Sequence, residues 1–397
     1  MGLNLTAAGL AVIGLGAALA GSYQLGRSAA PAAAVAAAAP AAVAASGPQT
    51  QGKVGADPSQ KFTHFRVGNK NVKRIFVDGD TVWVGTSGGA VRYDTKTDEY
   101  KLYDTKSGLL SNGVFYVGRI GERIGVGTYG GGLALLDAAT QKWDTYNVPE
   151  GLGDAFVYDV LKAKNGDLWI ATWSGVNRIK GGDLKDRSKW ELHTVESTKG
   201  GLPNDWVYGL AEGQNGDIWL GTEGGLALYK EGGWTNWNHA KGLGAPYERV
   251  KDHIDFKTDP AKVSEHHAKQ KQEMGLQKVD VAYNPNYIVA LAVDAQGVVW
   301  TGTWGGGLSR YDGKAWKHYS VTEGLPGNHV FMLNIDAKGQ LWVGTNNGLA
   351  RFKGEGGFEV MTTADGLFNN TVFSMATARD GTLWIGSFGG VAKVKPS

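Results

Sequence analysis

A short phrase recurs seven times along this 397-residue chain: a Trp or Ile, then small or apolar residues, then Thr or Ser. The copies are Trp83-Val-Gly-Thr, Ile124-Gly-Val-Gly-Thr, Trp169-Ile-Ala-Thr, Trp219-Leu-Gly-Thr, Trp300-Thr-Gly-Thr, Trp342-Val-Gly-Thr and Trp384-Ile-Gly-Ser. Successive copies are 41, 45, 50, 81, 42 and 42 residues apart. A period of about 40–50 residues built from short strand-like runs is the signature of a propeller or a solenoid.

Each copy lies inside a longer unit that predicts four antiparallel strands. A polar residue and a glycine precede the phrase in most copies, as in Asn165-Gly and Asn215-Gly, which is the chemistry of a tight hairpin turn. A Gly-containing turn and a second apolar run follow, and a last run carries aromatic residues three apart, such as Trp234 and Trp237. Four such strands form one propeller blade, so we expect an all-β, seven-bladed β-propeller over residues 61–397.

The two ends of the repeat region are complementary. The last repeat ends at Val394 without an outer strand of its own, whereas an extra outer-strand motif stands at the start, in Phe62-Thr-His-Phe65. We therefore predict that this N-terminal strand completes the last blade and closes the ring. Closure removes exposed sheet edges, which otherwise invite aggregation.

Composition narrows the classes of function. The net charge is +2 and no stripe of Lys or Arg is present, so nothing favours a nucleic-acid partner. Cysteine is absent, which excludes disulfides, thiol nucleophiles and Cys-ligated zinc. The 61 glycines and 14 tryptophans suit many turns between aromatic strands.

The first segment predicts a membrane anchor. Residues 3–25 contain no charged side chain, and as a helix they would span about 34 Å, enough for a bilayer core. We assign residues 1–27 to a transmembrane helix and the Ala/Pro-rich residues 28–60 to a linker; a cleaved signal peptide is the alternative. We expect a single-pass protein of a bacterial inner membrane with its propeller in the periplasm, although Arg27, after the helix, favours the cytoplasm.

The repeats resemble the two-component regulator propeller repeat family. The resemblance covers residues 61–397 and rests on the Leu-Trp-x-Gly-Thr-x-x-Gly-Leu-x-x-Tyr pattern and on the Gly-Leu-Pro turns at Gly201 and Gly324. It implies a propeller that occurs in periplasmic sensor regions and in free-standing proteins. Because no kinase follows the repeats before Ser397, we expect a free-standing propeller. The chain is also somewhat similar to streptogramin lyase propellers, but it offers no His/Glu cluster to carry over from them.

One face of the ring is expected to carry a binding surface. The turn after each phrase and the entry to each innermost strand should emerge on the same side, and many of these positions are aromatic. Aromatic side chains in a concave rim bind planar ligands, sugars or partner side chains. The candidates are Tyr129, Trp173, Trp206, Glu223, Tyr287, Trp304, His329 and Phe388. The alternative is that they pack against each other and plug the channel.

The 81-residue spacing predicts an insertion at about residues 246–285 on that same face. Asp259 and Pro260 should begin a polar helix that runs to Met274 and stops at Gly275. A polar helix without a clear apolar stripe is often solvated or docked on a partner. Its candidate partner-contacting residues are His253, His266, His267 and Met274. We expect no metal site there, because adjacent histidines on a helix diverge.

No nucleophile–base set, phosphate-binding loop or cofactor motif is recognisable. We therefore expect a non-enzymatic, membrane-anchored, extracytoplasmic propeller that acts as an interaction or scaffold subunit, accessory to a membrane complex. A ligand-sensing propeller of a signalling system and a lyase or glycan-active enzyme remain as alternatives.

Overall fold

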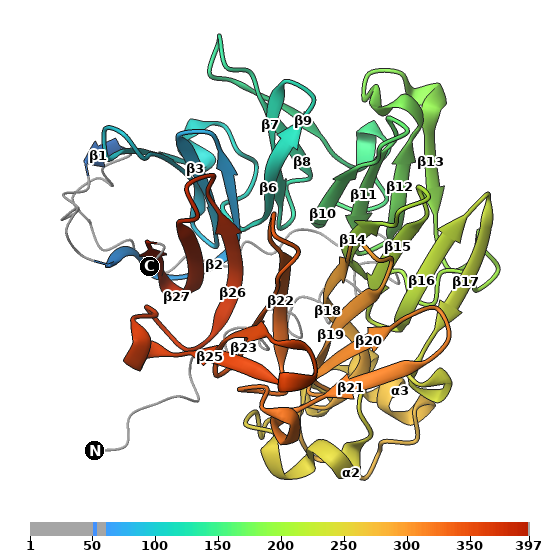
Figure 1. The fold of residues 1–397 in the computed structure, drawn as a ribbon. Helices are drawn as coiled ribbons and strands as arrows, with labels where there is room; N and C mark the ends of the chain where they lie inside the picture. The colour runs from blue at the N-terminus through green and yellow to red at the C-terminus, as the bar shows by residue number, and fades with distance from the viewer. Residues whose placement is uncertain (1–50, 54–60, 396–397) are drawn as a thin grey trace.

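In the computed structural model, residues 51–53 and 61–395 are described. Their sheets stand side by side around a central axis, so the chain is an all-β propeller (Figure 1). The expected anchor at residues 1–27 and nearly all of the linker at 28–60 lie outside the described residues. Within the described residues, no helix is long and apolar enough to span a bilayer.

Five separate blades contain four antiparallel strands each. One blade consists of β6 (Val114–Ile120), β7 (Arg123–Thr128), β8 (Leu133–Leu136) and β9 (Trp143–Tyr146). The next consists of β10 (Val157–Lys162), β11 (Leu168–Thr172), β12 (Gly175–Ile179) and β13 (Trp190–His193). The third consists of β14 (Val207–Glu212), β15 (Ile218–Thr222), β16 (Gly225–Lys230) and β17 (Gly233–Trp237). The fourth consists of β18 (Asn284–Val293), β19 (Val299–Trp304), β20 (Leu308–Tyr311) and β21 (Trp316–Tyr319). The fifth consists of β22 (Val330–Ile335), β23 (Leu341–Thr345), β24 (Gly348–Phe352) and β25 (Phe358–Met361).

The first and last repeats share one seven-stranded sheet in the order β1-β5-β4-β3-β2-β27-β26. Its strands are β1 (Gln51–Lys53), β2 (Phe62–Asp78), β3 (Thr81–Thr86), β4 (Gly89–Asp94), β5 (Glu99–Tyr103), β26 (Val372–Thr377) and β27 (Leu383–Val394). The structure thus shows five separate blades rather than the seven that the repeat count predicted. The reason is that β2 continues from an outer-strand position of the last repeat into the innermost strand of the first.

The termini of the repeat region pair as the motif count predicted. The start of β2 runs antiparallel to the end of β27, with Phe62 opposite Val394 and Phe65 opposite Val391. The innermost strands contact each other in the ring order β2, β6, β10, β14, β18, β22 and β26, and β26 contacts β2 again. The ring is therefore closed by strand pairing between segments more than 300 residues apart.

Six of the seven copies of the repeated phrase have a glycine where neighbouring blades come into contact. A Cβ atom at Gly302 would lie 2.3 Å from Cγ1 of Val330, the residue that begins the next innermost strand. At the closure, a Cβ at Gly386 would lie 2.4 Å from Cγ1 of Val72. Real Cβ atoms do not approach that closely, so glycine lets the second strand of one blade touch the innermost strand of the next.

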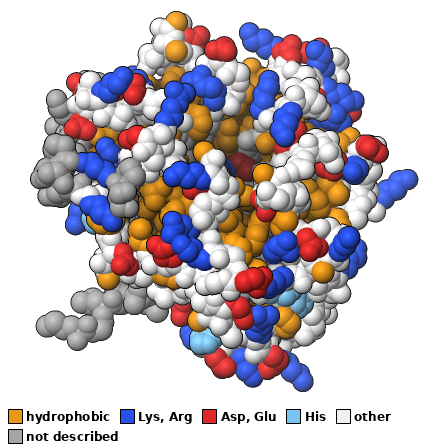
Figure 2. Space-filling view, in the orientation of Figure 1, with side chains coloured by type: hydrophobic (Ala, Val, Ile, Leu, Met, Phe, Trp, Pro, Cys, Tyr) orange, Lys and Arg blue, Asp and Glu red, His pale blue; other side chains and the backbone are white. Residues whose placement is uncertain are grey.

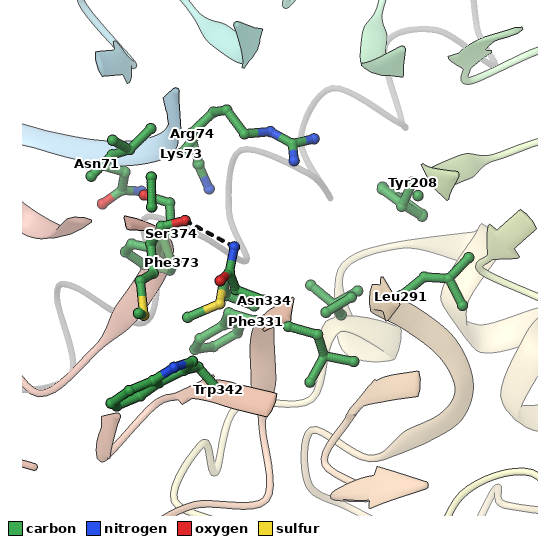
Figure 3. Close-up of a pocket in the computed structure, with 18 of the residues that line it drawn as sticks. Asn71, Lys73, Arg74, Tyr208, Leu291, Phe331, Asn334, Trp342, Phe373 and Ser374 are labelled. Carbon is green, nitrogen blue, oxygen red and sulfur yellow. Dashed lines mark hydrogen bonds between the residues drawn. The ribbon is translucent and has the colours of Figure 1, made fainter. Parts of the chain in front are cut away.

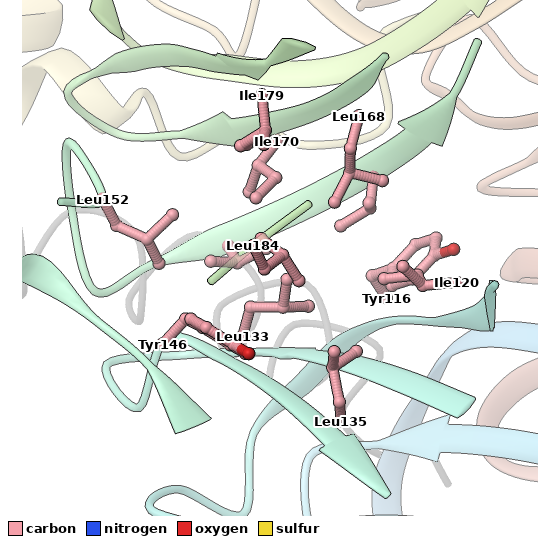
Figure 4. Packing of buried hydrophobic residues seen from close by; sticks show 12 residues of the cluster. Tyr116, Ile120, Leu133, Leu135, Tyr146, Leu152, Leu168, Ile170, Ile179 and Leu184 are labelled. Atoms are coloured by element: carbon pink, nitrogen blue, oxygen red, sulfur yellow. The ribbon is translucent and has the colours of Figure 1, made fainter. Parts of the chain in front are cut away.

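Between blades the core is apolar. Leu133, Leu168, Ile170 and Ile179 are fully buried between the β6–β9 blade and the β10–β13 blade (Figure 4). Burial of one such side chain stabilises the fold by about 1.5–3 kcal/mol. The blades are rigid supports for whatever their loops and inner strands present at the axis.

Two short helices belong to the inserted segment, α2 (Tyr247–Val250) and α3 (Glu265–Glu273). The expected single helix from residue 260 to 274 is wrong. Asp259 caps only the 3-10 turn Pro260–Lys262, and Ser264 then takes an extended conformation and caps α3 through the backbone N–H of His267. Two caps five residues apart begin two helical segments instead of one.

Candidate functional site

The innermost strands share a β-bulge that turns one side chain toward the axis. In every one of them the pairing register shifts at this residue, as between Val72 and Arg74 in β2, and β18 has a second shift between Asn284 and Ile288. A bulge re-aims the side chain at which it occurs. The bulge residues are Lys73, Phe115, Tyr158, Tyr208, Val289, Phe331 and Phe373. All of them line the central cavity.

This cavity has a volume of about 1620 Å³. It comprises the ring axis and a groove that leads outward between the β22–β25 blade and the β26–β27 hairpin. In that groove Trp342 and Ser374 lie near Asn334, whose side-chain amide donates to the Met375 carbonyl at 3.4 Å (Figure 3). The space-filling view shows a hollow in the middle of the ring with hydrophobic side chains in it and Lys and Arg side chains around it (Figure 2).

On one side of the ring, three of the predicted rim residues and Phe156 form a continuous aromatic stack. Trp173 lies between Phe156, at 4.5 Å and an interplanar angle of 8°, and Trp206, at 4.8 Å and 12°. Tyr129 meets Phe156 edge-on at 4.6 Å. Trp173 and Trp206 are 2% and 8% exposed, so neighbouring side chains cover most of their area. The packing alternative therefore accounts for much of this stack.

A second aromatic group lies beneath the insertion. Phe256 of the insertion stacks on Trp304 at 5.8 Å and 12°. His329 is fully buried, and its Nε2 contacts the Ala282 carbonyl at 2.9 Å. Burial lowers the pKa of His329 to about 3, so the imidazole is neutral and donates this hydrogen bond. Tyr287 and Phe388 are half-buried members of the same cluster.

Glu223 is a buried carboxylate held by two histidines of α3. Its oxygens lie 2.9 Å from Nε2 of His267 and 3.2 Å from Nε2 of His266, and the Glu223 side chain has no exposed area. The His266 ring also stacks on Trp206 at 4.2 Å. The insertion is thus tied to the rim by charge and by ring stacking together.

The pKa values of this pair reflect mutual stabilisation. Burial by itself would raise the pKa of Glu223, but the His267 charge and the hydrogen bonds from both histidines outweigh it and lower the value to about 2. Burial would lower the pKa of His267, and the Glu223 carboxylate more than reverses this, so the net shift is upward. The pair is therefore ionised in mildly acidic solution.

The insertion has its own packed interior. Val250, Ile254 and Tyr283 are at most 1% exposed, and Lys271 is buried in an ion pair with Asp259 and hydrogen bonds to the Val279 and Val281 carbonyls. Although α3 itself is polar, the segment builds a core, because its apolar residues lie in α2 and in the stretches on either side of α3. Of the four predicted contact residues, His266 and His267 face the ring, His253 is exposed and Met274 is half-buried.

Where the insertion does not reach, the mouth of the channel is lined by smaller residues. Ser87 is exposed, and Asn71 and Gly113 are half-buried. All three line the cavity. The Asn71 backbone N–H donates to the Ser87 hydroxyl at 3.2 Å. Lys73 lies two residues beyond Asn71 on β2, so its amine is below this open part of the mouth.

The charges near the axis differ in how they are compensated. Arg74 reaches Asp159 of the β10–β13 blade at 2.5 Å, and Asp159 also accepts from the Leu210 backbone N–H at 3.0 Å. Lys73 contacts two rings instead, with its Nζ 4.9 Å from the centre of Phe373 and 5.9 Å from that of Phe115. Burial lowers the pKa of Lys73 to about 8. Within residues 51–53 and 61–395, no three His, Asp or Glu side chains converge as metal ligands.

The rim aromatics were predictable from the repeat alignment, but the bulge residues were not. The bulge positions lie two residues farther along each innermost strand, where an ordinary alternation would point them into a blade interface. The signal in the sequence is a Lys at the one repeat position that is otherwise aromatic or Val. It becomes visible only once the bulge is known.

Comparison with known proteins agrees with this architecture. Five segments match the family described as two component regulator propeller: residues 151–174, 201–224, 282–305, 324–347 and 366–389. The chain therefore carries two component regulator propeller repeats, which confirms the resemblance found in the sequence. No curated protein matches the chain.

Among solved structures, the extracellular domain of the hybrid two component system BT3049 from B. thetaiotaomicron is 21% identical, with a TM-score of 0.64 over 85% of this chain and 41% of that one. The extracellular domain of the one component system BT4673 from the same organism is 17% identical, with a TM-score of 0.60 over 85% and 40%. Virginiamycin B lyase from Staphylococcus aureus, with quinupristin, is 12% identical, with a TM-score of 0.57 over 85% and 99%. This chain spans about two fifths of the first two, and at such identities the likeness shows the fold alone.

Proposed function

We propose that this chain is a non-enzymatic, extracytoplasmic binding propeller that holds its ligand in the central channel. The observation that carries the proposal is the ring of bulge side chains: a β-bulge in every innermost strand turns Phe, Tyr, Val and Lys toward one cavity. Deep apolar cavities with few polar groups are the usual form of small-ligand sites in proteins. Among the expected functions, this favours ligand sensing over a purely structural scaffold.

The seven-stranded sheet is best treated as two blades that share β2. Its β26 strand, the two arms of β27 and the start of β2 form one set of four, and the rest of β2 with β3, β4 and β5 forms another. This division makes seven blades around the channel. It also places the shared strand, and with it Lys73, at the closure of the ring.

The similar solved structures support an extracytoplasmic location for the propeller. The two regulator propellers with the higher TM-scores are extracellular domains of bacterial signalling systems. We propose accordingly that residues 1–27 anchor the chain in a bacterial inner membrane and that the propeller lies in the periplasm. We also propose a protein partner in a membrane complex, which contacts exposed parts of the insertion such as His253. Such a contact is compatible with ligand binding in the channel. Through it, the partner would respond to the ligand-bound propeller.

The decisive test is to fill the channel without disturbing the core. Val289 is the smallest bulge residue, so Val289→Trp should occupy cavity space, whereas Val148→Trp adds the same volume at an exposed loop position. Saturation-transfer NMR with the full-length protein and the neutral probes indole and indole-3-acetamide should show binding to wild type and to the Val148 variant. We expect the Val289 variant to bind at least about tenfold more weakly with an unchanged melting temperature. Equal binding by all three proteins, or none by wild type, would disprove channel binding.

A further inference from the structure

We propose that the central channel recognises a carboxylate attached to an aromatic or apolar body, and that the amine of Lys73 is the partner of that carboxylate. This inference deepens the proposed function and rests on it. It assigns the ligand a charge and assigns one end of the ligand to one position of the ring.

Lys73 is the single charged side chain among the seven bulge positions. The other six are Phe115, Tyr158, Tyr208, Val289, Phe331 and Phe373, which supply only ring faces, methyl groups and phenol hydroxyls. Figure 3 shows Lys73 extending from β2 into the space between Phe373 and Tyr208. An apolar ring with one cation at its edge is complementary to a molecule with one anionic end.

The cation has no anionic partner in the described part of the protein. Among residues 51–53 and 61–395, no carboxylate forms an ion pair with Lys73. The Lys73 amine instead contacts the faces of the Phe373 and Phe115 rings. Two carboxylates that line the cavity, the half-buried Asp159 and the buried Asp259, are engaged elsewhere, with Arg74 and with Lys271 respectively. Burying an ammonium without a counter-ion costs free energy, and a Met or Leu would fill the same space without that cost.

One access route to the cavity leads past this cation. Over the rest of the ring the mouth is narrowed by stacked rings or roofed by the insertion, but above Lys73 it is bordered by Asn71, Ser87 and Gly113. A ligand that enters there meets the amine first with its anionic end, or passes it and leaves that end beside it. Its apolar body then lies against Phe331, Phe373 and the tyrosines across the channel.

A carboxylate fits this site better than a phosphate does. A phosphate monoester carries up to two charges and is bound by several donors, usually Arg side chains or a row of backbone N–H groups. Here the neighbouring guanidinium of Arg74 is already held by Asp159. A single ammonium flanked by rings matches a singly charged, planar anion, and the rings are suited to an attached aromatic group.

The test compares acids with their neutral amides. Indole-3-acetate and indole-3-acetamide have the same shape and differ in charge, and a short peptide ending in phenylalanine can be made with a free or an amidated terminus. Affinities for the full-length protein are measured by saturation-transfer NMR titration with wild type, Lys73→Met and Lys73→Arg. The first pair represents free aromatic acids and the second represents peptide termini.

In wild type the acid of at least one pair should bind about tenfold more tightly than its amide, the size expected for a charge-assisted hydrogen bond. Lys73→Met should abolish this preference while leaving amide affinity unchanged, and Lys73→Arg should retain it. The pair that shows the preference identifies the source of the carboxylate. Because Met is accommodated without a buried charge, the Met variant should melt no lower than wild type.

Three results would overturn the inference. Equal affinity of acid and amide would remove the charge preference but leave channel binding intact. A preference that survives in Lys73→Met would place the anion elsewhere in the ring. Failure of acids and amides alike to bind wild type would disprove both the carboxylate inference and the proposed function.

Discussion

The covered and open parts of the channel mouth use equivalent repeat positions in opposite ways. After the repeated phrase, Trp304 is buried under Phe256 of the insertion, whereas Ser87 at the matching position is exposed. At the entry to the innermost strands, His329 is fully buried and Asn71 is half-buried. A single strand framework therefore supports both a packed roof and an entrance, and the side chain at each repeat decides which one forms.

This difference separates stability from binding. Residues under the insertion are held by many partners, so changing them should mainly affect folding. Residues at the entrance have few partners, so changing them should mainly affect what binds and how quickly.

The largest expected effect is on the covered side. Trp304→Ala removes a ring that packs against Phe256, Tyr287 and Phe331, and should lower the free energy of unfolding by about 3–5 kcal/mol. Ser87→Ala at the matching position should change it by less than about 0.5 kcal/mol. Denaturant titration followed by circular dichroism measures both. Equal effects would show that the two sides are not built differently.

The attachment of the insertion should depend on pH. The lowered pKa of Glu223, about 2, means that the stability it contributes is fully present above the ordinary value of 4.5 and is lost as the pH falls from there toward 2. That loss is on the order of 3 kcal/mol. His267 has a raised pKa, so its contribution is fully present below 6.5 and is lost as the pH rises through its higher folded-state value.

We therefore expect the His267–Glu223 pair to be strongest between about pH 4.5 and 6.5. Hydrogen exchange of α3 across that range and on either side of it measures the opening of the insertion. Glu223→Gln should lower protection of α3 and flatten its acid dependence. Glu196→Gln, at an exposed loop position, is the matched control. Unchanged exchange in the Glu223 variant would show that stacking alone holds the insertion.

On the open side, binding of acids should weaken in alkaline solution. Lys73 is charged below its pKa of about 8, so the preference for an acid over its amide should be present near pH 7 and disappear as the pH rises through 8. The groups that face Lys73 are the uncharged Phe115 and Phe373 rings, and Arg74 on the same strand stays paired with Asp159. Lys73→Arg should extend the preference to about pH 10. A flat profile in wild type would argue against Lys73 as the partner.

The smallest effect is expected at the entrance itself. Ser87→Tyr narrows the mouth without touching the packed core, so stability should stay within about 0.5 kcal/mol of wild type. Association of indole-3-acetate should slow several-fold while the dissociation rate falls in parallel, leaving affinity nearly unchanged. Relaxation-dispersion NMR of the ligand measures these rates. A large loss of affinity would instead place Ser87 in contact with the bound ligand.

Most of the framework could be predicted because its signals are local. A polar residue followed by glycine makes a tight turn, and a short apolar run bounded by such turns makes a strand, so the blades follow from short segments. The pairing of Phe62 with Val394 was also predictable, because the surplus motif at one end of the chain matches the deficit at the other. The prediction of seven separate blades differed from the structure because β2 pairs with both β27 and β3. This single strand joins the last and the first repeat in one sheet.

The candidate site was only half predictable, for a physical reason. The aromatic rim follows from aligned repeats, but whether Trp173 binds or packs depends on Phe156 of its own blade and Trp206 of the next blade lying on either side of it. Glu223 and His267 are 44 residues apart, and nothing in either local pattern announces their contact. The Lys73 side chain points toward the axis because of a bulge, and that bulge forms only when β2 pairs with β3. Turns and short apolar strands are determined by residues within each repeat. Burial, charge compensation and the direction of a bulged side chain are determined only when the blades close into a ring.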